Sequence, residues 1–265
     1  MYWQKRFERA NPDEEIEQEI KEIFEAHNGN YGYRRIEMIL RSRGKTINHK
    51  KIQRIKKKLN LQSTKFTRKS RSYNSYKGNV GKIAKNLIRR RFNTTVPHQK
   101  ITTDTTEFKY YIKSTCGKIT IKKAYLDPFL DMYNSEIISY RVSPSPNAQA
   151  VNGALVEAIE RTSDCKYRRT FHSDQGWAYQ MHQYRNLLKK SRIYQSMSRK
   201  GNCLDNSVME NFFGVMKQEM YYGEIFESFD ALKNAIDDYI LYYNNERIKS
   251  KLKCSPVIYR LKHAA

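Results

Sequence analysis

The chain has 265 residues, a length that suits one or two domains, and a formal net charge of +23. Its apolar share is only 39%, no stretch approaches the length of a membrane span, and residues 1–10 lack the apolar run of a secretory signal. Its four cysteines form no C-x-x-C pair and have no histidine at zinc-ligand spacing. We therefore expect a cytoplasmic, nucleoid-associated protein with no membrane partner, no zinc site and free thiols.

The positive charge is concentrated in the first third of the chain. From Arg34 to Arg91, 21 residues are Lys or Arg and one, Glu37, is acidic. This charge density is typical of proteins that contact nucleic-acid phosphates. A solvated basic surface or a disordered tail is the alternative, but apolar residues at helical spacing in the same segment favour a folded element.

Residues 11–61 show helical patterns. Asn11 can cap a first helix that begins at Pro12, and two further helical patterns flank a glycine-containing turn at 43–45. The last of these helices, capped by Asn48, predicts a helix-turn-helix whose final helix faces DNA; a purely structural pair of helices is the alternative. Five basic residues lie on its face opposite the apolar side: Lys50, Lys51, Arg54, Lys57 and Lys58.

Residues 62–98 are rich in Ser, Thr, Lys and Arg, so we expect a basic linker that can lie along phosphates. From 99 to about 260 the texture changes to β-branched runs alternating with amphipathic helices. Their order, β-β-β-α-β-α-β-α-α, predicts an α/β domain with a mixed five-stranded sheet flanked by helices. Strands are expected at 101–112, 117–126, 135–143, near Phe171 and at 192–197, and helices at 148–162, 178–190, around Glu210 and from Ser228.

Three acids in this domain have mostly uncharged neighbours. Asp104 lies among threonines in the first strand, Asp174 follows a short strand, and Glu210 lies in a helix, with 35 residues between Asp174 and Glu210. Singly, such an Asp is more often a turn former and such a Glu a solvent-facing residue. Acids gathered at strand ends and on a helix can instead hold two Mg²⁺ ions for in-line phosphoryl transfer.

The helix around Glu210 has one polar stripe. Asn206, Glu210, Phe213 and Lys217 recur at i, i+4, i+7 and i+11, which predicts one face turned toward the aspartates. Asn206 is expected to hydrogen-bond the carboxylates, and Lys217 suits a DNA phosphate. His172, two residues before Asp174, is expected to be a structural hydrogen-bonding residue rather than part of the site.

The motifs TTDTTEF, FHSDQGWAYQ, SMSRKGNCLDNSVMENFFGVMKQE and YNNERIKSKLKCSP resemble those of bacterial insertion-sequence transposases of the IS3 type. The resemblance runs from about Pro12 to Arg260. In that family this chain is the product of the second open reading frame, OrfB. The resemblance implies a ribonuclease-H-like, retroviral-integrase-like core, preceded by a helix-turn-helix.

The resemblance also implies roles. Asp104, Asp174 and Glu210 would be the metal-binding catalytic triad for Mg²⁺ or Mn²⁺, with Lys217 as a DNA contact. The reaction would be cleavage and strand transfer of insertion-sequence DNA ends. The partners would be double-stranded DNA (terminal inverted repeats and target), the upstream-frame OrfA product or a fusion with it, and further copies of the chain.

Some positions depart from the family pattern. Ile101 stands where the family usually has Trp, and Arg168 and Arg169 precede HSDQG where aliphatic residues are usual. Two arginines inside a central strand would be costly unless they lie at its start. A catalytically weak copy acting as a DNA-binding regulator is therefore an alternative. A nuclease acting on RNA–DNA hybrids is disfavoured by the helix-turn-helix.

Overall fold

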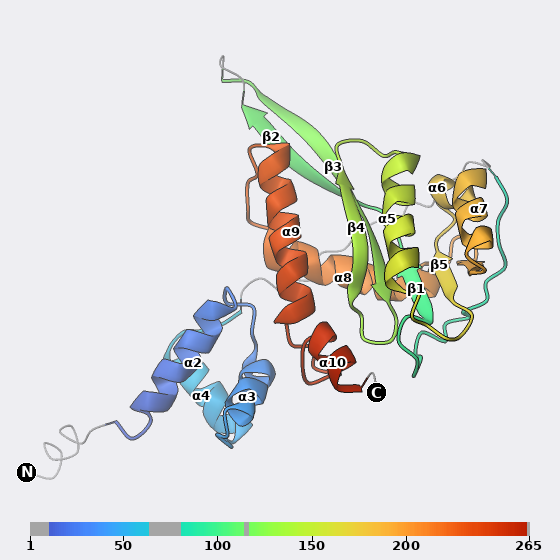
Figure 1. Ribbon diagram of the computed structural model, residues 1–265. Helices are drawn as coiled ribbons and strands as arrows, with labels where there is room; N and C mark the ends of the chain where they lie inside the picture. Colours follow the sequence, from blue (N-terminus) through green and yellow to red (C-terminus); the bar gives the residue numbers. More distant parts are fainter. Residues whose placement is uncertain (1–10, 64–80, 114–116, 264–265) are drawn as a thin grey trace, which may run out of the picture. The chain divides into compact units, whose positions relative to one another are not determined.

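The computed structural model describes residues 11–63, 81–113 and 117–263, which belong to two compact units divided after Lys69. The described part of the first unit holds three helices, α2 (Glu14–Ala26), α3 (Tyr33–Ser42) and α4 (His49–Lys58), which contact one another (Figure 1). Their apolar faces bury six branched aliphatic side chains: Ile20, Ile23, Ile36, Leu40, Ile52 and Ile55. The predicted helical domain is confirmed.

The capping residues of this unit differ in part from expectation. The Asn48 side chain accepts a hydrogen bond from the Lys50 backbone N–H at 2.9 Å and caps α4 as predicted. Helix α2 begins later than expected, with Asp13 at its N-cap position, and Asn11 accepts instead from the Asp13 N–H at 3.1 Å.

The second unit is built on a mixed sheet, and its described residues form six strands. Strand β1 is parallel to β5, β5 is parallel to β6, and β3 is antiparallel to β1, β2 and β4. The expected count of five was one short, because the strand predicted over 101–112 is interrupted at Asp104 and Thr105. The strands are β1 (Lys100–Thr103), β2 (Thr106–Lys113), β3 (Ile119–Asp131), β4 (Ile137–Ser143), β5 (Thr170–Ser173) and β6 (Tyr194–Met197).

Helices cover both faces of this sheet, and the alternation of side chains along β3 sends successive residues to opposite layers (Figure 1). Phe129 packs in one apolar cluster with α5 (Ala148–Arg161), α6 (Trp177–Gln180) and α7 (His182–Lys190). Leu130 packs in the other cluster with α8 (Ser207–Met216) and α9 (Phe229–Asn245). The predicted α/β fold with flanking helices is confirmed.

Part of the expected linker belongs to the core. Residues 81–98 lie against the second unit: the Leu87 N–H donates to Ser196 Oγ at 2.9 Å, and Asn86 Nδ2 donates to Asp205 at 2.9 Å. The Met197 N–H also donates to the Lys85 carbonyl at 3.4 Å, so this segment covers the edge of β6. Residues 64–80 of the predicted linker lie outside the described residues.

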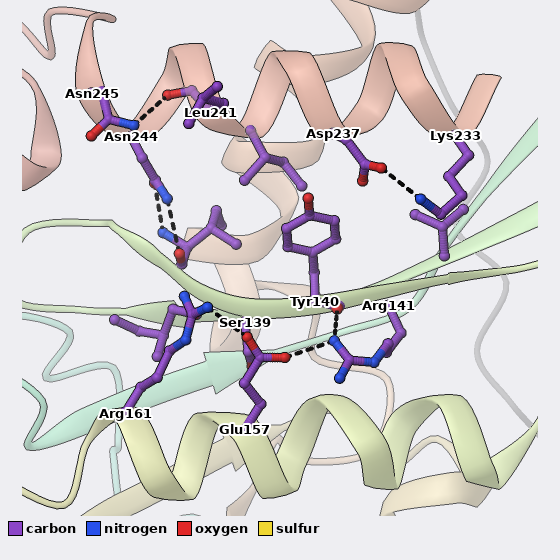
Figure 2. A pocket seen from close by; sticks show the side chains of 14 residues that line it. Ser139, Tyr140, Arg141, Glu157, Arg161, Lys233, Asp237, Leu241, Asn244 and Asn245 are labelled. Carbon is purple, nitrogen blue, oxygen red and sulfur yellow. Dashed lines mark hydrogen bonds and ion pairs between the residues drawn. The ribbon is translucent and has the colours of Figure 1, made fainter. Parts of the chain in front are cut away.

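The other edge of the sheet, β4, is closed by side chains (Figure 2). Asn244 on α9 exchanges two hydrogen bonds of 2.9 Å with the backbone of Ile137, as a neighbouring strand would, and Arg161 on α5 donates to the Ile138 carbonyl at 2.8 Å. Between the two helices remains a hollow of about 420 Å³. Because its polar groups already bond one another, we assign this hollow to edge protection.

Three further differences concern single elements. The helix predicted over 178–190 is two short helices, α6 and α7, separated at Met181. A final helix, α10 (Pro256–His263), was not predicted. Arg168 and Arg169 precede β5, which begins at Thr170, so neither lies inside the central strand. Within the described residues, no helix has the length and apolarity needed to cross a membrane.

Candidate active site

Asp104 lies in a two-residue gap between β1 and β2. The backbone N–H of Thr105 donates to Asp104 Oδ1 at 2.8 Å, and the Thr105 hydroxyl donates to Asp127 Oδ1 on β3 at 2.6 Å. Leaving the strand ladder at this point frees backbone groups that would otherwise pair with β3. The break therefore places Asp104 just beyond the carboxyl end of β1, a central strand of the sheet.

Asp174 lies just beyond the carboxyl end of the neighbouring strand. Strand β5 is parallel to β1, with Thr102 opposite His172, so Asp104 and Asp174 each follow this pair by two residues. Parallel neighbouring strands lie about 4.8 Å apart. The backbone N–H of Gly176 donates to Asp174 Oδ1 at 2.8 Å, and a Cβ at position 176 would lie only 2.9 Å from that oxygen. Any side chain at this position of the HSDQG motif would therefore displace the Asp174 carboxylate.

The two aspartates line one cavity of about 250 Å³. A third carboxylate, Asp127, lines it as well, and Asp127 is 2% exposed. The other residues that line the cavity are Thr105, Tyr125, Pro146, Asn147, Val151, Gly176, Trp177, Ala178 and Tyr179.

Burial and neighbouring charge raise the pKa values of the carboxylates in this region. Burial and then the charge of Asp174 raise the pKa of Asp104 well above its usual range, with smaller contributions from Glu210 and Asp127. Burial also raises the pKa of Asp174, and it raises that of Asp127 to about 6. Acids held together against this cost are typical of functional sites.

Glu210 lies on α8, is exposed, and does not line the cavity. Its contribution to the pKa of Asp104 places it within electrostatic reach of that carboxylate. Among the described residues, however, no three His, Cys, Asp or Glu side chains are gathered closely enough to form a metal cage. Asp104 and Asp174 therefore line one cavity and Glu210 lies near it, but the three side chains do not converge on a common metal position.

The donor set suits a hard divalent cation. Asp104, Asp174 and Glu210 offer only oxygen ligands, which Mg²⁺ and Mn²⁺ prefer. None of the three makes an ion pair with any residue that the structure describes. Asp104 and Asp174 are half-buried without a counter-charge, which is costly, and a bound cation would reduce that cost. The residues present thus fit the metal.

Asn206 and His172 make hydrogen bonds to groups other than the three acidic side chains. Asn206 is buried in the 3₁₀-helix η1 (Cys203–Asn206), and its Oδ1 accepts from the Thr102 hydroxyl at 2.9 Å rather than binding a carboxylate. His172 is buried between Ser196 Oγ at 2.8 Å and the Asp205 carbonyl at 2.9 Å, which fits the structural role expected for it. These bonds tie β1 and β5 to the segment that begins α8.

The polar stripe predicted on α8 is not continuous. Phe213 is buried in the apolar cluster, and a π-helix, η2 (Lys217–Tyr221), follows α8 directly and changes the angular spacing. Lys217 Nζ donates to the Glu107 carbonyl at 2.7 Å and lies 4.8 Å from the centre of the Phe108 ring. The assignment of Lys217 to a DNA phosphate stays a prediction.

The basic face predicted on α4 is partly neutralised within its own unit. Lys51 and Arg54 pair with Asp13 at 2.6 and 2.8 Å, and Lys58 pairs with Glu17 at 2.6 Å. Lys50 and Lys57 are exposed and form no ion pair with the described residues. The five cations thus divide into two that form no ion pair with the described residues and three that are paired with a carboxylate.

Sequence reasoning missed Asp127 and Tyr179. Asp127 stands in the run AYLDPFLD, whose apolar residues marked only a buried strand, and Tyr179 follows the HSDQG motif as one aromatic residue among many. An acid within an otherwise apolar strand was the signal available for Asp127. Nothing in the sequence alone indicated that either residue faces the cavity.

Comparison with known proteins agrees with this architecture. Residues 94–203 and 210–263 match family models described as integrase core domain, and residues 11–70 match an HTH-like domain. The protein named transposase InsK for insertion sequence element IS150, from Escherichia coli K12, is 42% identical over 254 residues, covering 95% of this chain and 85% of that protein. The transposase InsF for insertion sequence IS3A, from the same organism, is 30% identical over 210 residues, covering 79% and 69%.

A solved structure shares the fold. The chain matches, with a TM-score of 0.51 and 15% identity, a chain in the cryo-EM structure of the simian T-cell lymphotropic virus intasome in complex with PP2A regulatory subunit B56 gamma. The match covers 72% of this chain and 61% of that one. At this identity the likeness concerns the fold alone.

Proposed function

The chain belongs to the insertion-sequence transposases of the IS3 type, which carry an integrase core, and from this premise we propose that Asp104, Asp174 and Glu210 catalyse cleavage and strand transfer at the ends of an insertion sequence. It is a DNA transposase, and so a polynucleotidyl transferase. The proposal concerns which residues carry the reaction and how they do so.

One observation carries the proposal. Asp104 and Asp174 follow the same registered pair of β1 and β5, just beyond the carboxyl ends of these strands, and both Asp174 and Glu210 raise the pKa of Asp104. A regulator that only binds DNA has no need of two neighbouring aspartates in one cavity with a glutamate in electrostatic reach of one of them. The arrangement is therefore better explained by chemistry that requires their charge.

The division of labour follows from the placement of the residues. Two divalent cations held by the three acids would activate an attacking water or 3′-hydroxyl and stabilise the leaving oxygen. Asp104 and Asp174 hold fixed positions, because a backbone N–H orients each carboxylate. Glu210, exposed on α8, is free to turn toward them when DNA and metal arrive. The DNA strand would lie over the carboxyl ends of β1 and β5.

We further propose that the first unit recognises terminal inverted repeats in double-stranded DNA through α4, and that the chain acts on the nucleoid in the cytoplasm. Lys50 and Lys57 would make the first phosphate contacts, since they need not break an ion pair. Assembly of several copies on the two element ends, with the upstream-frame product or as a fusion with it, completes the proposal.

The test compares Asp174→Asn with the unaltered chain on DNA fragments carrying the ends of the insertion sequence, in Mg²⁺ or Mn²⁺. We expect strand cleavage and joining to fall at least about 100-fold while DNA binding persists, because the change removes a charge from the site and not from the first unit. Unchanged cleavage by Asp174→Asn would overturn the assignment. No cleavage by either protein, with binding intact, would favour the DNA-binding regulator.

A further inference from the structure

The cavity behind Asp104 contains a hydrogen-bond relay that the proposed chemistry does not use. Thr105 occupies its centre and makes two bonds to acids: its backbone N–H donates to Asp104 Oδ1 at 2.8 Å, and its hydroxyl donates to Asp127 Oδ1 at 2.6 Å. The Tyr179 hydroxyl lies 3.3 Å from Thr105 Oγ1. A hydroxyl has one hydrogen, so Tyr179 donates to Thr105 when Thr105 donates to Asp127.

Asp127 and Tyr179, at the two ends of this relay, are held in place by the fold. Asp127 is 2% exposed on β3, between the buried residues Leu126 and Pro128. Tyr179 is also 2% exposed, and its ring packs edge-on against Tyr184 at 5.4 Å between centres. Thr105, by contrast, lies in the gap between β1 and β2, where no strand pairing fixes its backbone. The hydrogen bonds of the Thr105 side chain therefore hold this residue in place of backbone pairing between strands.

We propose that Asp127 is a positioning residue, which through the Thr105 hydroxyl fixes the backbone N–H that orients the carboxylate of the metal ligand Asp104. This inference rests on the proposed function, because it takes Asp104 as a cation ligand. Asp127 acts as a hydrogen-bond acceptor from the α5 side of the sheet and does not itself touch the cation.

The physical reason is the geometry of Asp104. A carboxylate next to a second one is pushed away by repulsion, and before a cation binds only local hydrogen bonds keep it in place. Residues that orient metal ligands typically change metal affinity by 10–100-fold when removed. Thr105 also follows Asp104 directly, so a small rotation of this peptide would turn the carboxylate away from Asp174.

The test uses two substitutions that leave the charge unchanged. Thr105→Val keeps the shape and removes the hydroxyl, whereas Thr105→Ser keeps the hydroxyl. Mn²⁺ affinity would be measured by isothermal titration calorimetry on the whole chain without DNA. We expect Thr105→Val to weaken binding by about tenfold and Thr105→Ser to stay within about twofold. Equal affinity of the valine and serine variants would overturn the proposal.

A double substitution tests the path from Asp127. If Asp127 acts through Thr105, the variant with both Asp127→Ala and Thr105→Val binds Mn²⁺ no more weakly than the weaker single variant. Losses that multiply would instead make Asp127 a cation ligand in its own right and would contradict the positioning role. Both outcomes concern affinity and do not depend on catalytic turnover.

Asp104→Asn separates this inference from the proposed function. It should reduce Mn²⁺ affinity more than any change at Thr105. If it does, and Thr105→Val has no effect, only the positioning role fails. If Asp104→Asn also leaves Mn²⁺ binding unchanged, the assignment of the catalytic acids fails with it.

Discussion

The aspartates that line the cavity are partly removed from water, although a carboxylate is more stable when it is hydrated. Asp104, Asp127 and Asp174 lose hydration, and burial is the first cause of the raised pKa in each case. Their hydrogen bonds from Thr105 and Gly176 offset only part of that cost. The free energy of unfolding of the metal-free protein should therefore be lowered at neutral pH by these ionised aspartates.

This gives a prediction for Asp127→Asn in metal-free protein. The pKa of Asp127 rises from 3.8 to about 6 on folding, so the folded state keeps a proton that the unfolded state loses between these values. Stability is full below about pH 4 and falls as the pH rises toward 6. The asparagine variant should be more stable than the parent at pH 7, by up to about 3 kcal/mol. In urea unfolding this advantage should disappear near pH 4; an equal difference at both values would contradict it.

Sequence spacing identified some site residues and could not identify others. Asp104 and Asp174 were predictable because each ends a strand pattern, and parallel pairing brings such ends together. Asp127 and Tyr179 were not, because they meet only when β3 and α6 pack around Thr105. Asn206 was predicted on the correct element, but its partner, Thr102, depends on how η1 crosses β1.

At the scale of elements, the segment after Glu210 depends on a buried ion pair. Arg247 donates to both oxygens of Glu219 at 2.6 Å, and the Tyr239 hydroxyl donates to the same carboxylate at 2.9 Å. Both charged residues are buried. The pair joins the π-helix η2, which directly follows α8, to the residues just after α9.

Arg247→Met should therefore destabilise the chain strongly. It leaves the carboxylate of Glu219 buried without its counter-charge, which typically costs about 3–5 kcal/mol. The matched control is Lys233→Met on α9, whose pair with Asp237 is partly exposed and should contribute at most about 1 kcal/mol. Urea unfolding measures both, and similar costs for the two variants would contradict the buried pair's role.

In the helix-turn-helix unit, acidic side chains at the start of α2 occupy basic side chains of α4 that are predicted to contact DNA phosphates. Asp13 and Glu17 on the N-terminal side of α2 hold three of the five basic residues predicted to face DNA on α4. If α4 faces DNA as we propose, DNA binding replaces these pairs with phosphate contacts. The basic pattern of α4 was legible from sequence, whereas its pairing with acids more than thirty residues earlier was not.

Neutralising these acids should strengthen DNA binding. The double variant Asp13→Asn, Glu17→Gln frees Lys51, Arg54 and Lys58, so we expect tighter binding and a steeper fall of affinity with salt. The single variant Glu22→Gln serves as the control. Glu22 also lies on α2, but it accepts a hydrogen bond from Gln18 and does not pair with a cation on α4. Fluorescence anisotropy over a salt series measures both. An effect of Glu22→Gln as large per charge as that of the double variant would contradict the competition.

For the whole molecule, the sequence pattern led to the α/β class and the order of elements, because strands and helices here have clear periods. It misjudged residues 81–98, whose polar composition indicated a linker although they bond β6 and the Asp205 region. Such a segment cannot be told from a linker without the sheet edge that it covers. The division into a small helical unit and an integrase core agrees with the family matches.

We propose that Asp104, Asp174 and Glu210 together hold the cations of the reaction. Anomalous X-ray diffraction at the manganese edge, from crystals of the chain bound to DNA ends and soaked in Mn²⁺, would locate these cations. We expect manganese peaks within about 2.0–2.3 Å of carboxylate oxygens from all three residues, with Asp127 outside that distance. Peaks held by Asp104, Asp127 and Asp174, with Glu210 turned away, would contradict it.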